Sequence, residues 1–399
     1  MESDPERVDD SPVWREDLVF ASCASTVVIG LFLDGWNHIN LQNGALGSFF
    51  TPWHGVLYAG FTVTATWLAL RNLHLVRPTV DARSQYHTYF GVPLRYPFAV
   101  FGVLIATLGL VGDAIWHTVF GEEKGVARVI APFHLVLFCG AVLLLAAPIR
   151  SGWYATNVYS STATFKQFFP VLLSLTLVVA SVAFMFQWLS AFIDWQPSLT
   201  LGELPPSLAS DPAVVGTVQF AGVARVLVTN VILVAPLLLA LRRWRLPTGS
   251  ITFLFTVVAA GMSTLTEFQQ GWIIVAAVIG GVAGDALLKL WAVTPERTFE
   301  TRAFAASMSA VLWVAYFVVL RVAYDIRWPF DLWVGTVGVS MICSVLVSIL
   351  VLPSTRAPVS WGEMPGSAST PWLRLRRSSS GAMARTEAIG ADRTPPMPA

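Results

Sequence analysis

The sequence predicts an all-α integral membrane protein, a polytopic bundle of about ten transmembrane helices. Of its 399 residues, 55% are hydrophobic and only 12% are charged, and the mean hydropathy of +0.64 lies outside the range of soluble globular domains. The apolar residues are also gathered into separate runs of roughly 20 residues, the length that crosses a bilayer. Polar segments divide these runs, which indicates a chain that crosses the membrane repeatedly.

The expected helices follow one another along the chain. Their ranges are 17–35, 52–72, 96–117, 130–149, 168–190, 218–241, 251–267, 272–291, 303–321 and 331–352. The stretch before the first of them, MESDPERVDDSPVWRED, is acidic and polar. Because a secretory signal begins with basic residues, we expect the first apolar run to be a retained helix.

Basic residues in the loops predict the orientation of the bundle. They follow the second, fourth and sixth expected helices, whereas the loops on the other side are poorer in them. By the positive-inside rule both termini are cytoplasmic, and the dominance of Arg among the basic residues favours a bacterial plasma membrane.

The expected organisation has four parts. Residues 1–16 form a cytoplasmic N-terminal segment, 17–149 contain four helices with a repeated motif, and 150–352 contain the other six helices. Residues 353–399 are rich in Pro, Ser and Arg, so we expect a disordered cytoplasmic tail.

Two pairs of segments in the first four helices resemble each other and share their polar residues. GLFLDGWNH (30–38) matches GLVGDAIWH (109–117), and PWHGVLYAG (52–60) matches PFHLVLFCG (132–140). The matched polar residues include four of the six histidines in the chain: Asp34, His38, His54, Asp113, His117 and His134. The sequence therefore predicts an internal parallel repeat of helix hairpins, each with one Asp and two His.

Helical spacing gathers each set on one side of the membrane. Asp34 and His38 are four residues apart and project from one helix face, and His54 begins the helix that returns from the same side. Two imidazoles and one carboxylate form a ligand set for iron, zinc or copper that leaves coordination positions open. Helix capping and Asp–His pairing are the alternative explanations, and one dinuclear or two mononuclear sites are both compatible with the sequence.

An Asp-x3-His at a helix end followed by a His in the next helix resembles the copper site in the C subunit of particulate methane and ammonia monooxygenases. The resemblance covers Asp34, His38 and His54, and equally Asp113, His117 and His134. It implies copper and oxygen chemistry, with copper favoured over iron or zinc. This chain differs in a longer stretch before the second His, in the duplication of the motif and in its ten expected helices.

Glu267 is a further candidate, because it lies in the tight TEFQQGW connection on the same expected side as the histidines. It could handle protons or orient an imidazole from outside the ligand shell. A solvated loop residue is the alternative interpretation. The three cysteines lie in apolar runs without metal-type spacing and indicate no disulfide or thiolate site.

These features favour a metal-dependent membrane oxidoreductase at the outer face, acting on a small or lipid-soluble substrate. The alternatives are a metal-ion or small-solute transporter, and a non-catalytic membrane subunit or pH sensor whose histidines titrate. The expected partners are the lipid bilayer and the substrate. The near-neutral net charge of +1 indicates no nucleic-acid partner, and assembly into a homo- or hetero-oligomer stays open.

Overall fold

A computed structural model describes residues 13–41, 52–73, 87–89, 92–94, 96–121, 125–154, 164–193, 207, 211–294, 296–324, 326 and 328–352. The chain divides into two units, Met1–Pro353 and Ser354–Ala399, and all described residues belong to the first. The expected disordered tail and residues 1–12 of the expected N-terminal segment lie outside the described residues.

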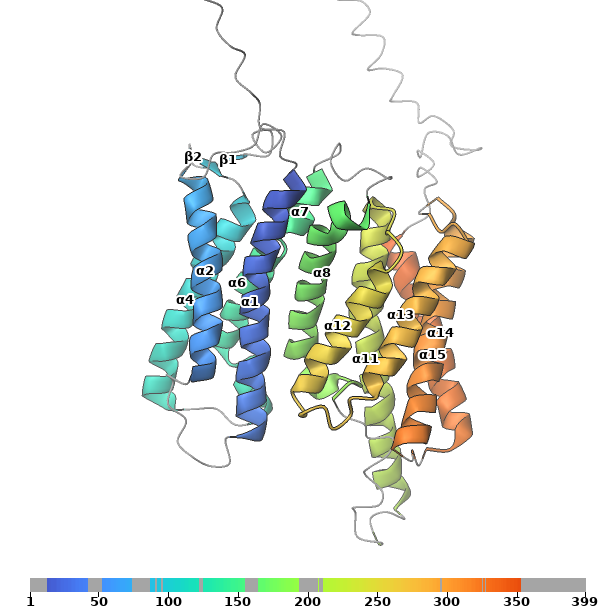
Figure 1. Cartoon of the computed structure of the whole chain (residues 1–399). Helices are drawn as coiled ribbons and strands as arrows, with labels where there is room; N and C mark the ends of the chain where they lie inside the picture. Colours follow the sequence, from blue (N-terminus) through green and yellow to red (C-terminus); the bar gives the residue numbers. More distant parts are fainter. Residues whose placement is uncertain are drawn as a thin grey trace, which may run out of the picture. The chain divides into compact units, whose positions relative to one another are not determined.

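Helices make up nearly all of the described part (Figure 1). They are α1 (Val13–Asn40), α2 (Pro52–Asn72), α4 (Pro97–Phe120), α5 (Val126–Ile130), α6 (Pro132–Leu145), α7 (Ala147–Tyr154), α8 (Phe165–Met185), the 3-10 helix η1 (Gln187–Leu189), α11 (Pro212–Arg243), α12 (Ser250–Thr264), α13 (Ile273–Leu290), α14 (Thr298–Ala323) and α15 (Phe330–Val351). The only strands among the described residues, β1 (His87–Tyr89) and β2 (Val92–Leu94), pair antiparallel between α2 and α4.

Seven of these helices are long and apolar enough to cross a membrane: α1, α4, α8, α11, α13, α14 and α15. An eighth span forms if α6 and α7, which meet at a bend of 41°, are counted together. The multi-pass helical prediction is confirmed, whereas the count of ten is not. Of the two remaining expected spans, α12 has only 15 residues, and α2 has 21 residues but contains no stretch as apolar as those of the seven.

The first helix begins four residues earlier than expected because its acidic residues have partners inside the protein. Glu16 forms an ion pair with Arg71 of α2. The Asp17 carboxylate accepts hydrogen bonds from the hydroxyls of Tyr96, at 2.5 Å, and Ser151, at 2.8 Å. Charged groups are tolerated at membrane depth when they are paired in this way, so the helix extends to Val13.

Two hairpins, α1–α2 and α4–α6, lie side by side on one side of α8 (Figure 1). In both hairpins the two helices pack closely against each other at a glycine. A Cβ added at Gly30 would lie 2.5 Å from Cα of Leu57, and one added at Gly109 would lie 2.7 Å from the backbone nitrogen of Leu137. Small residues allow such contacts between membrane helices, so the two glycines fix how near the histidines on opposite helices come.

Helices α11 to α15 pack on the other side of α8, and buried polar groups join them. Asp285 of α13 accepts hydrogen bonds from the backbone nitrogens of Ile251 and Thr252 at the start of α12, at 3.2 and 3.0 Å. It thereby satisfies donors that the first turn of a helix leaves unpaired. Asp285 is thus a structural cap, which explains a carboxylate within a membrane helix.

Candidate metal centre

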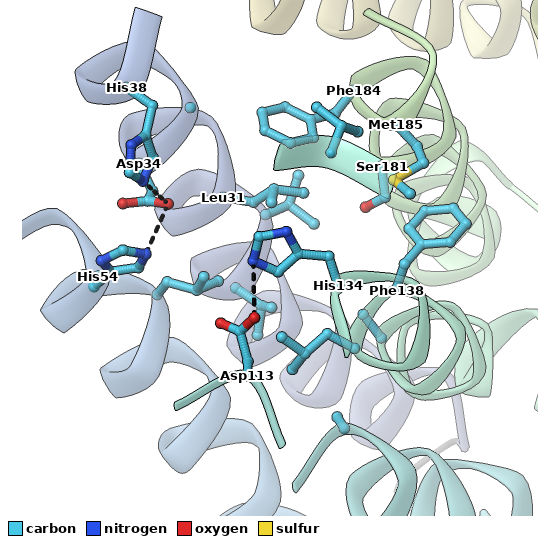
Figure 2. A pocket seen from close by; sticks show the side chains of 18 of the residues that line it. Leu31, Asp34, His38, His54, Asp113, His134, Phe138, Ser181, Phe184 and Met185 are labelled. Atoms are coloured by element: carbon cyan, nitrogen blue, oxygen red, sulfur yellow. Dashed lines mark ion pairs between the residues drawn. The ribbon is translucent and has the colours of Figure 1, made fainter. Parts of the chain in front are cut away.

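The first Asp/His group is formed where α1 ends and α2 begins. His38 lies in the last turn of α1, Asp34 lies one turn earlier, and His54 lies in the first turn of α2. Oδ2 of Asp34 lies 3.5 Å from Nε2 of His38 and 3.2 Å from Nε2 of His54. Both imidazoles therefore point at one carboxylate oxygen (Figure 2).

The second group repeats this geometry at the end of α4 and the start of α6. Oδ1 of Asp113 lies 3.4 Å from Nε2 of His117 and 3.2 Å from Nε2 of His134. The Asp113 side chain is only 6% exposed, yet this oxygen accepts no hydrogen bond among the described residues. Buried polar atoms in proteins usually have a partner. An ion bound by this oxygen and by both imidazole nitrogens would supply one.

The spacing in both groups suits coordination of one ion. Ligands bound at about 2.0–2.1 Å in tetrahedral geometry lie about 3.3 Å from one another, and the four measured distances run from 3.2 to 3.5 Å. A charge-assisted hydrogen bond between imidazole and carboxylate would be shorter, about 2.7–2.9 Å. In each group the three ligand atoms lie within 4.8 Å of one another, so both groups could hold a metal ion.

A hydrogen bond fixes the tautomer of one ligand. Nδ1 of His117 lies 3.3 Å from the carbonyl oxygen of Gly121. Because a carbonyl only accepts, Nδ1 carries the proton, and in the neutral imidazole Nε2 carries the lone pair that a metal would bind. Gly121 has φ of 79°, a conformation that glycine adopts without strain, so the residue that ends α4 also orients the imidazole.

One cavity of about 400 Å³ brings the two groups together. All six predicted ligands line it, at the end where α1 and α4 terminate. The rest of the wall is mainly apolar and includes Leu31, Phe138, Phe184 and Met185 (Figure 2). The lining residues come from α1, α2, α4, α6 and α8 as well as short segments, so the two hairpins face each other across a shared space.

Tyr58 is a lining residue that the sequence did not single out. Its ring is stacked on that of His54, with centroids 5.7 Å apart and planes 10° from parallel. Its side chain lines the same cavity as Asp34 and Asp113. The matched PWHGVLYAG and PFHLVLFCG segments contain the signal that could have found it, because both place an aromatic residue four positions after the histidine.

The structure does not bring Glu267 to the metal groups. It lies exposed in the turn between α12 and α13, with a φ of 53°, and it does not line the cavity. Its turn is nevertheless near the end of α1, because Nδ2 of Asn40 donates a hydrogen bond to the carbonyl of Leu265, at 3.0 Å. Glu267 therefore lies in a turn close to the end of α1 but outside the cavity, and its role in handling protons stays a prediction.

The six histidine and aspartate residues thus form two matching groups on one cavity, in a helical bundle with at least seven candidate membrane spans among the described residues. Comparisons with protein-family models, with curated proteins and with solved structures find no match for this chain.

Proposed function

We propose that this protein is an integral membrane metalloprotein with one metal ion in each Asp/His group, and that it acts as a metal-dependent oxidoreductase. The observation that carries the proposal is the pair of groups on one cavity, each with a carboxylate and two Nε2 atoms at coordination spacing. We infer further that α1–α2 and α4–α6 are copies of one metal-binding hairpin.

The donor set favours particular ions. Imidazole nitrogen suits copper, iron and zinc, whereas magnesium and calcium prefer oxygen ligands. Three protein ligands leave at least one position open for water or substrate, as catalytic sites do and closed structural sites do not. Copper is our first choice, because the Asp-x3-His arrangement resembles the monooxygenase copper site. The bound ion would supply electron transfer and oxygen reactivity.

The chain's own residues account for the environment of that chemistry. Asp34 and Asp113 supply negative charge that offsets the charge of the ions, and their burial keeps the carboxylates out of water. The apolar wall of the cavity excludes water and admits lipid-soluble molecules. An apolar wall also disfavours transport, since a cation moving inward from the groups would meet no charged lining residue.

The test begins with metal content. The full-length protein is purified in detergent without added chelator, and bound metals are measured by elemental mass spectrometry. We expect two equivalents of copper or iron in the wild type and none in the double variant His54→Ala, His134→Ala. Each single variant should lose one equivalent if the sites are separate, whereas a dinuclear site would lose both from either change. His87→Ala, in β1 and outside both groups, is the control and should keep both ions.

A second measurement tests the reaction class. The metal-loaded protein is reduced with ascorbate under anaerobic conditions and then exposed to dioxygen, while its electron paramagnetic resonance spectrum is recorded. A redox-active site should change its signal reversibly, and the double variant should not. Stoichiometric zinc without redox change would overturn the oxidoreductase proposal, and accumulation of metal inside proteoliposomes would replace it with transport.

A further inference from the structure

The shared cavity is longer than two metal sites need. Along α1 its lining residues run from His38 back to Val27, a distance of about 16 Å at roughly 1.5 Å per residue. On α6 they run from His134 to Leu145. The cavity therefore continues from the end of the bundle into the depth that the middle of a membrane span occupies.

Polar and apolar groups are segregated along this length. The six Asp and His side chains, with Tyr58, lie in the parts of their helices nearest the helix ends, whereas the deeper lining is formed by aliphatic and aromatic side chains such as Val28 and Leu145. Ser181 is a deep polar exception, but its hydroxyl donates to the carbonyl of Leu177 on its own helix, at 2.9 Å. The hydroxyl hydrogen of Ser181 is thus already used within α8 and is not available to a ligand.

This gradient has the same direction as that of the bilayer, in which polar heads lie at the surface and hydrocarbon lies inside. A molecule with one aliphatic chain and a small polar head matches both halves of the cavity at once. Its head would lie between the two Asp/His groups, and its chain would lie along Leu31, Leu110 and Phe138. A volume of about 400 Å³ is in the usual range for a small-molecule site.

We propose that the cavity binds a single-chain aliphatic amphiphile, such as a fatty alcohol, with its polar head at the Asp/His groups and its chain pointing toward Leu145. The inference deepens the proposed function and rests on it for the role of the head group. Binding of the chain depends only on the deep apolar half of the cavity.

The test uses a decanol analogue that carries a photoreactive diazirine near its methyl end. The full-length protein in detergent is irradiated with the analogue and digested, and the labelled residues are located by mass spectrometry. We expect labels on α6 and α8 residues of the deep half. Decanol should suppress them, whereas butanol at the same mole fraction in the micelle should not.

Two variants block the deep half from neighbouring helices of the second hairpin, Ala141→Phe on α6 and Leu110→Trp on α4. Each should lose most of the deep labelling. Cys139→Phe is the matched control, because Cys139 is exposed on α6 and does not line the cavity. It should label as the wild type does. Two blocking positions are used so that misfolding of one variant leaves the other informative.

Metal content is measured on the same samples to separate the two proposals. Deep labelling that the blocking variants abolish supports the amphiphile inference, whether or not metal is bound. Labelling spread over the lipid-facing helix surfaces and equal in all variants overturns it. If two equivalents of metal are present in that case, the proposed function stands alone. Deep labelling in a protein that takes up no metal would overturn the proposed function and leave the cavity as a lipid-binding site.

Discussion

Tyr58 and Phe138 occupy corresponding positions in the two hairpins and differ by one hydroxyl group. Both side chains line the cavity. The ring stacked on His54 of the first group therefore carries a hydroxyl that Phe138 lacks, although the candidate ligands of the two groups are the same. This difference predicts that the two proposed metal sites bind exogenous ligands with different strength.

Azide, an anionic ligand for open metal positions, can measure that difference. In His134→Ala, which keeps only the first group, the added change Tyr58→Phe should weaken azide binding about tenfold, the effect of losing one hydrogen bond to a charged group. In His54→Ala, which keeps only the second group, Phe138→Tyr should strengthen it. Absorption titration at constant metal content gives both values. Equal azide affinity before and after Tyr58→Phe would contradict a hydrogen bond from this hydroxyl.

Single residues of the site were predictable from the sequence only where they belong to the repeated motif. The six candidate ligands could be identified because each Asp and His recurs at a matching position in the second hairpin. The α8 residues Phe184 and Met185 are not part of that repeat. In the sequence of a membrane helix, an apolar residue that lines a cavity cannot be distinguished from one that packs in the core. Glu267 shows a further limit, because the sequence does not reveal that its turn lies near the end of α1 without lining the cavity.

At the scale of helices, Gly60 predicts how the first hairpin is held together. A Cβ at this position would lie 2.6 Å from a backbone carbon of Thr26, which cannot move aside as a side chain could. We therefore expect Gly60→Ala to destabilise the protein by about 1–3 kcal/mol. It should also lower the metal content of the first group by separating α1 from α2, and thermal unfolding together with metal analysis measures both effects.

The control for Gly60→Ala lies on the same helix. A Cβ added at Gly55 meets nothing within 4 Å, so Gly55→Ala should be neutral or stabilise α2 slightly, because alanine favours helix more than glycine. A loss of stability equal to that of Gly60→Ala would show that the helix, and not the close contact, is sensitive to the change.

The positions of the helices were largely predictable because runs of apolar residues define them. The residues at which the helices begin and end were harder to predict. The expected span 130–149 contains a bend, with α6 ending at Leu145 and α7 beginning at Ala147. Pro148 in the first turn of α7 lacks a backbone donor and is a signal for such a break. At the start of α1, the sequence does not reveal the contacts that Glu16 and Asp17 make with Arg71, Tyr96 and Ser151 from other parts of the chain.

For the whole molecule, the distribution of basic residues predicts that the metal groups face the cell exterior. Thr118 and Lys289 are exposed near the ends of α4 and α13, which terminate at opposite ends of the bundle (Figure 1). In a protein whose native Cys23, Cys139 and Cys343 are replaced by serine, a membrane-impermeant maleimide should label Thr118→Cys in intact cells. It should label Lys289→Cys only after permeabilisation. The reverse pattern would place the Asp/His groups on the cytoplasmic side.

The packing of helices into the bundle could not be predicted from the sequence. Hydropathy identifies which segments enter the membrane, but it does not indicate which of them pack together, because lipid and protein are equally apolar surroundings. The position of α8 beside both α1 and α12 is an example. The cavity depends on that position, since Phe184 and Met185 complete its wall.

The short helix α12 has a consequence for how the protein fits its bilayer. Its 15 residues extend about 22 Å, less than the hydrocarbon thickness of roughly 30 Å. A lipid-facing helix of this length would require the bilayer to thin around it. None of its residues is exposed, and Asp285 caps its first turn from α13. The short helix α12 is thus surrounded by protein, so its length causes no mismatch with the bilayer. The longer outer helices, such as the 22-residue α15, set the membrane thickness that the bundle matches.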